Sequence, residues 1–66
     1  MTYDEIIYTL KNVNRLNGLE LHQRNEQVDV ILTFNNGGLS NSEYNLLMAT
    51  KLMIDNEYKK RGDYNG

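Results

Sequence analysis

The spacing of apolar side chains changes along the chain and separates the predicted elements. Near the N-terminus, apolar residues recur every three or four positions, which places them on one face of a helix. Thr2 and Glu5 form a T-x-x-E capping box, in which each side chain bonds the other residue's backbone N–H. Asn17-Gly18 is expected to end this helix, because glycine accepts the left-handed conformation. We predict a helix over about residues 2–16. Its apolar positions are Tyr3, Ile6, Ile7, Leu10 and Val13.

The following segment has a different period, which favours strands. Leu19 and Leu21 alternate with polar residues, and a second alternation has its apolar members every two positions. Alternation with β-branched residues is typical of half-buried strands. The polar residues 23–27 between the two runs are long enough for a turn. We therefore predict an antiparallel hairpin over about residues 19–35. The second alternation consists of Val28, Val30, Leu32 and Phe34.

The Asn-Asn-Gly-Gly run at residues 35–38 separates the hairpin from a long helix. Ser40 and Glu43 form a second capping box, and apolar residues at helical spacing continue to about residue 61. We predict a helix over residues 41–61 and a frayed tail over 62–66. The α-β-β-α order predicts an α+β fold in a single domain, residues 1–66, with the hairpin packed on the long helix. A two-stranded sheet leaves open edges, so we expect a homodimer with a four-stranded sheet.

Composition restricts the possible functions of the chain. It has nine acidic and seven basic residues, no cysteine and a net charge of −2, which disfavours direct binding of nucleic acid. The apolar run Val30–Leu32, like every other apolar run in the sequence, is too short to cross a bilayer, so we expect a soluble, cytoplasmic protein without membrane contact. The one histidine, His22, has no cysteine nucleophile or metal-ligand set beside it. We expect no enzymatic activity, no metal and no cofactor.

The aromatic residues indicate a binding protein. Five of the 66 residues are tyrosine, a side chain enriched at protein interfaces. Tyr3, Tyr44 and Tyr58 fall on the apolar faces of the predicted helices, so packing in the core explains them equally well. Tyr8 lies off the face of its helix. Both interpretations of the tyrosines remain open at this point.

The segment Gly38-Leu39-Ser40-Asn41-Ser42-Glu43-Tyr44-Asn45-Leu46-Leu47 resembles a known family. It is similar to the small uracil-DNA glycosylase inhibitors of Bacillus phages with protein-primed replication. The resemblance implies a dimer that mimics DNA and captures an apolar side chain of the host glycosylase between two helices. It implies that Tyr44, Leu47 and Met48 line this groove and that Glu43 keeps an acidic position at its rim. The partner would then be the host uracil-DNA glycosylase in the host cytoplasm.

A second function, of a different class, is compatible with the same sequence. The chain can be a small dimeric regulatory or accessory module that binds another protein without mimicking DNA. The two hypotheses differ in their surfaces. A DNA mimic needs carboxylates such as Glu26, Asp29 and Glu43 around an apolar groove, whereas an accessory module does not.

Overall fold

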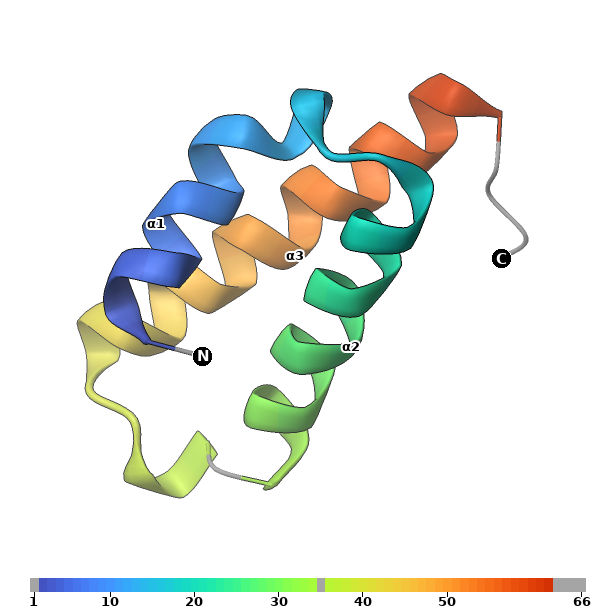
Figure 1. Ribbon diagram of the computed structural model, residues 1–66. Coiled ribbons are helices and arrows are strands. Elements are labelled where there is room, and N and C mark those ends of the chain that lie inside the picture. The colour runs from blue at the N-terminus through green and yellow to red at the C-terminus, as the bar shows by residue number, and fades with distance from the viewer. Residues whose placement is uncertain (1, 35, 63–66) are drawn as a thin grey trace.

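Every regular element among the described residues is a helix or a 3₁₀ turn. The computed structural model describes residues 2–34 and 36–62, and these contain three α-helices and no strand (Figure 1). The α+β class predicted from the sequence is therefore wrong. The elements are α1 (Tyr3–Asn12), a 3₁₀ turn η1 (Val13–Arg15), α2 (Gly18–Phe34), a second 3₁₀ turn η2 (Asn36–Gly38) and α3 (Asn41–Arg61).

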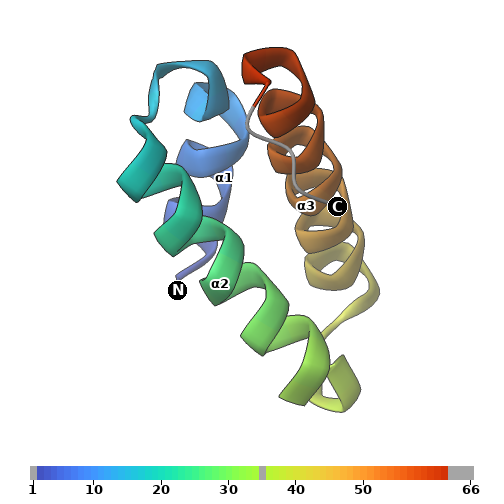
Figure 2. The ribbon, with the colours of Figure 1, turned by 90° about the vertical axis from the view of Figure 1, so that its right-hand side faces the viewer.

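The third helix is the centre of the arrangement. α1 and α3 run in roughly the same direction and α2 runs back the opposite way (Figures 1 and 2). Both α1 and α2 pack against α3, whereas contacts between α1 and α2 are few. The core is accordingly small and is shared by all three helices and the η1 turn. Its buried apolar residues are Ile6, Val13, Leu16, Leu21, Val28, Leu47 and Ile54.

The predicted hairpin over 19–35 is wrong because this segment forms helix α2. Leu21 and Val28, seven residues apart, are both completely buried on the face that packs against the other helices. Ile31 and Leu32 continue that face as half-buried side chains. The segment thus contains a helical spacing in addition to the strand-like alternation. The expected four-stranded sheet of a dimer has no counterpart, because the described residues contain no strand edge.

The prediction that Asn17-Gly18 ends the first helix is also wrong, because these residues begin α2. Asn17 and Glu20 form a capping box: the Glu20 backbone N–H donates to Asn17 Oδ1 at 2.8 Å, and the Asn17 N–H donates to Glu20 Oε1 at 3.1 Å. Asn17-Gly18 was expected to end the first helix, but it begins the second. Gly18 has no positive φ, since Gly62 is the one residue with a positive φ in the described part of the chain. The N-x-x-E pattern was present in the sequence and predicts a helix start.

Both predicted capping boxes are confirmed. Thr2 caps α1 and Ser40 caps α3, each through the reciprocal bonds with the glutamate three residues later. The long helix has the predicted bounds of 41–61, and it ends at Gly62, whose φ is 79° and whose N–H donates to the Lys59 carbonyl. The N-terminal helix predicted over 2–16 is α1 followed by η1. Of the frayed tail predicted over 62–66, Gly62 is instead the C-cap of α3, and residues 63–66 lie outside the described residues.

The helices were also compared with the requirements for crossing a membrane. Within residues 2–34 and 36–62, no helix has both the length and the apolar character required to cross a bilayer. This agrees with the short apolar runs in the sequence.

Glu5 joins α1 to α2 with its two carboxylate oxygens. Oε1 accepts the Thr2 backbone N–H at 3.0 Å, which completes the cap of α1. Oε2 lies 3.3 Å from Arg24 Nη1 on α2. The backbone and hydroxyl hydrogen bonds of Thr2, and then Arg24, lower the pKa of Glu5 below its usual value. The Glu5 carboxylate therefore caps the N-terminus of α1 and also links α1 to α2 through Arg24.

This lowered pKa makes the stability depend on pH. Since the folded chain holds Glu5 ionised more strongly than the unfolded chain does, the contribution is complete above the ordinary pKa of 4.5 and is lost as the pH falls through the folded pKa. We expect Glu5→Gln to be less stable at pH 7 and to show a weaker decline in unfolding free energy below pH 4.5. Urea unfolding between pH 7 and pH 3 measures this. Asp4→Asn, in the same helical turn, controls for net charge, and an identical slope for both variants would contradict the assignment.

Candidate protein-binding surface

Three apolar side chains form an exposed row along α3. Tyr44, Met48 and Leu52 are spaced four residues apart, so they lie above one another on the same side of the helix. Their exposed fractions are 41%, 45% and 61%. The buried residues of α3, Leu47 and Ile54 among them, occupy a different face. We call Tyr44, Met48 and Leu52 the α3 row.

The four site residues suggested by the resemblance do not gather into one groove. Tyr44 and Met48 are exposed and belong to the α3 row. Leu47 is completely buried in the core and does not reach the surface. Glu43 is half-buried, and its Oε1 accepts the Ser40 backbone N–H at 3.2 Å, so its carboxylate caps the helix. Leu47 and Glu43 therefore stabilise the fold, and Tyr44 and Met48 remain exposed for binding.

Sequence reasoning missed Leu52 as a binding residue. Neither the helical spacing nor the resemblance singled it out, but its side chain is the most exposed of the α3 row. The signal that identifies it is the four-residue spacing from Met48, and from Tyr44 before it. The spacing identifies an exposed row only when the structure shows that the other apolar face of α3 is buried in the core.

The side of the α3 row nearest α2 is bordered by ion pairs. Lys51 Nζ lies 3.0 Å from Asp29 Oδ1 on α2 and 3.6 Å from Asp55 Oδ1 on its own helix. The same ammonium donates to Asn25 Oδ1 at 2.7 Å. Two carboxylates thus share this ammonium group, and Lys59 adds a second positive charge one turn after Asp55. Asp55 follows Leu52 by three residues, so charged groups of both signs border the apolar row.

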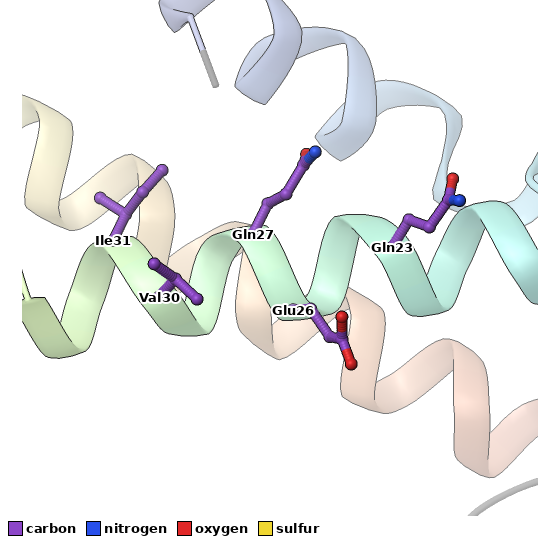
Figure 3. A pocket seen from close by; sticks show the side chains of 5 residues that line it. All are labelled: Gln23, Glu26, Gln27, Val30 and Ile31. Carbon is purple, nitrogen blue, oxygen red and sulfur yellow. The ribbon is translucent and has the colours of Figure 1, made fainter.

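A second exposed apolar surface lies on α2. Leu19, Val30 and Phe34 are 67%, 51% and 77% exposed. Around Val30 is an open hollow of about 520 Å³, lined entirely by α2 residues (Figure 3). In Figure 3, Gln23, Gln27 and Ile31 point to the side of α2 on which α1 lies, and Glu26 points to the other side. The polar lining residues are Gln23, Glu26 and Gln27.

Three of the polar side chains have partners within the protein. His22 lies on the surface of α2, with Nε2 3.0 Å from Glu26 Oε1. Thr9 and Thr50 are completely buried, and their hydroxyls donate to carbonyls of their own helices, each at 2.8 Å. No three His, Cys, Asp or Glu side chains in residues 2–34 and 36–62 come close enough together to hold a metal ion.

Comparison with known proteins adds no relative to this picture. No protein-family model, no curated protein and no solved structure matches the chain. The fold and the two surfaces define a small three-helix protein of the all-α class. The exposed surfaces of the chain are therefore the evidence on its function.

Proposed function

We propose that this chain is a small helical module that binds another protein through the α3 row. The observation that carries the proposal is the exposure of three large apolar side chains, Tyr44, Met48 and Leu52, at consecutive helical turns of α3. The same helix buries its opposite face in the core. A helix with two apolar faces has one more face than this chain can cover, and a partner supplies the missing contact.

The residue types of the α3 row suit binding. Tyrosine presents a large area with few rotatable bonds and is enriched among the residues that dominate binding energy. Methionine is flexible and adapts to an irregular apolar surface. The ion pairs of Lys51 with Asp29 and Asp55 border the row with polar groups, as the rim of an interface has. The expected target surface is therefore apolar at its centre and polar at its edge.

We expect Tyr44→Ala and Leu52→Lys to remove target binding without unfolding the chain. Truncation of a central tyrosine costs about 2 kcal/mol of binding free energy at a hot spot. Tyr8→Ala is the matched control, because Tyr8 is 55% exposed and lies on α1. Affinity capture from lysate with the four chains, followed by calorimetry on the recovered protein, measures the effect. A binding partner retained equally by all four chains would contradict the proposal.

Inhibition of uracil-DNA glycosylase by DNA mimicry is the alternative function, and it can be tested directly. The hairpin predicted over residues 19–35, directly before the matching segment, is absent from the described residues. Residues 38–47 instead end η2, connect it to α3 and form the first turns of that helix. We expect uracil excision by a bacterial uracil-DNA glycosylase to proceed unchanged with the chain in large excess. Stoichiometric inhibition, lost in Tyr44→Ala, would contradict this and favour DNA mimicry.

A further inference from the structure

A groove of about 270 Å³ lies between α1 and α3 and is lined by side chains of α1, η1 and α3. None of its lining residues belongs to the α3 row or to α2. α1 packs beside α3 (Figures 1 and 2). The Arg61 guanidinium donates to the carbonyls of Val13 and Leu16, which holds the last turn of α3 against η1. The walls are therefore fixed by contacts of the fold, and we call this hollow the α1–α3 groove.

The floor of the α1–α3 groove is apolar. Leu10 and Val13 line it from α1 and η1, and Met53 lines it from α3. Val13 is 3% exposed, whereas Met53 is 44% exposed. A hydrocarbon group placed in the groove would remove this apolar surface from water. The thioether side chain of Met53 is flexible and can adapt to the shape of such a group.

The rim of the α1–α3 groove carries two positive charges. Lys11 comes from the last turn of α1 and Lys60 from the last turn of α3, and both side chains are exposed. Asn14 and Asn56 line the same hollow and add amide donors. Two ammonium groups around one hollow repel each other, and an anion between them relieves this repulsion. Ammonium and amide N–H groups are donors that suit the oxygens of a carboxylate.

The one carboxylate that lines the groove does not cancel these charges. Glu57 Oε2 lies 2.7 Å from Arg61 Nε, and the Glu57 side chain is only 10% exposed, so its charge is neutralised within the fold. Although the net charge of the chain is −2, five of its seven basic residues lie in the last turns of α1 and α3 and in η1. Charges at short range dominate the attraction of a small ion, since salt screens the more distant ones. These five residues are Lys11, Arg15, Lys59, Lys60 and Arg61.

We propose that the α1–α3 groove binds a small organic anion, a carboxylate attached to a short hydrocarbon chain. The carboxylate accepts hydrogen bonds from Lys11 and Lys60, and the chain covers Leu10 and Met53. The volume of about 270 Å³ lies just below the roughly 300–1,000 Å³ of a site for a drug-sized ligand. It therefore favours a molecule of the size of octanoate over a long-chain fatty acid.

Titration of the full chain with octanoate, followed by NMR of the methionine methyl groups, tests the proposal. Of the three methionines, Met53 lines the groove and Met48 belongs to the α3 row. The expected result is a saturable shift of the Met53 methyl signal while that of Met48 stays in place. The expected dissociation constant is on the order of 1 mM, as for other small ligands. An unmoved Met53 signal, or equal shifts of Met48 and Met53, would overturn the proposal.

Related ligands separate the contribution of the charge from that of the chain. Octanol has the same chain without the charge, and octylammonium reverses the charge. Both should bind about tenfold more weakly than octanoate, since they lose the exposed charge pairs with the two lysines. Acetate, which lacks the chain, should not shift Met53. Equal binding of octanol and octanoate would overturn the assignment of an anion to this groove.

Matched variants locate the charge that is recognised. Lys60→Gln is expected to weaken octanoate binding about threefold, the effect of one exposed charge pair. Arg15→Gln removes the same charge from the same end of the molecule, but Arg15 does not line the groove, so binding should be unchanged. Equal weakening by both variants would contradict a site in the groove. Tyr44→Ala should also leave octanoate binding unchanged, so this inference and target binding by the α3 row can each fail alone.

Discussion

Arg61→Ala is expected to lower the free energy of unfolding by about 3 kcal/mol, because it leaves a buried carboxylate without its partner. Arg61 Nε lies 2.7 Å from Glu57 Oε2, and the Glu57 side chain is only 10% exposed. The guanidinium also donates to the carbonyls of Leu16 at 2.6 Å and of Val13 at 3.3 Å. One side chain thus neutralises a buried charge and holds the end of α3 against the connection between α1 and α2.

The size of this effect is large for so small a chain. At about 0.05–0.15 kcal/mol per residue, a 66-residue protein has roughly 3–10 kcal/mol of total stability. Loss of the Arg61 contacts removes a third or more of that amount. The variant should therefore unfold at a clearly lower temperature and urea concentration than the wild type. Thermal and urea unfolding, followed by circular dichroism, measure the change.

Two further variants isolate the cause. Arg15→Ala removes an exposed arginine from η1 and should alter the unfolding free energy by less than about 0.5 kcal/mol. The double variant Glu57→Met with Arg61→Met removes both charges, and we expect it to recover part of the loss because no unpaired charge is buried. Equal stability of Arg61→Ala and Arg15→Ala would contradict the assigned function of Arg61.

Glu26→Pro is expected to cost about 3 kcal/mol or more, because residue 26 lies in the interior of helix α2. Proline there removes one backbone hydrogen bond and its ring collides with the preceding turn. In a hairpin, the same residue would sit in the polar turn over 23–27, where proline is tolerated. The substitution therefore separates the two structures of this segment by a large margin. Helical content at 222 nm and the urea midpoint are the measurements.

Glu26→Ala is the control for this experiment. Both variants remove the exposed contact between Glu26 and His22, and an exposed ion pair contributes little. The difference between them therefore reports the backbone alone. Near-identical stability of Glu26→Pro and Glu26→Ala would mean that residues 23–27 are not helical.

The candidate site was predictable only in part. Helical spacing placed Tyr44 and Met48 on the long helix, and both are exposed in the structure. The same spacing could not say that Leu47, next to Met48, is completely buried. Apolar residues on two faces of α3 are equivalent in the sequence, and the position of α1 and α2 decides which face becomes core. Leu52 was missed for the same reason.

The sequence by itself determined the features that depend on neighbouring residues. The capping boxes of Thr2 with Glu5 and of Ser40 with Glu43 close through bonds three residues apart, so their patterns predict the starts of α1 and α3. Gly62 and the basic last turn of α3 likewise mark its end. These interactions need no distant partner, and they were correct without knowledge of the fold.

The N-x-x-E pattern marks the start of α2 locally, and only the tertiary structure decided the state of the rest of the segment. This segment contains both an alternating pattern and a helical one, which local preference does not separate. Burial of Leu21 and Val28 in the shared core stabilises the helical pattern, and Lys51 of α3 holds Asn25 and Asp29 on the same side. The alternating residues Val30 and Phe34 are left on the surface as a consequence. The physical reason is that burial energy comes from residues far away in the chain, and these contacts exist only after α3 has packed.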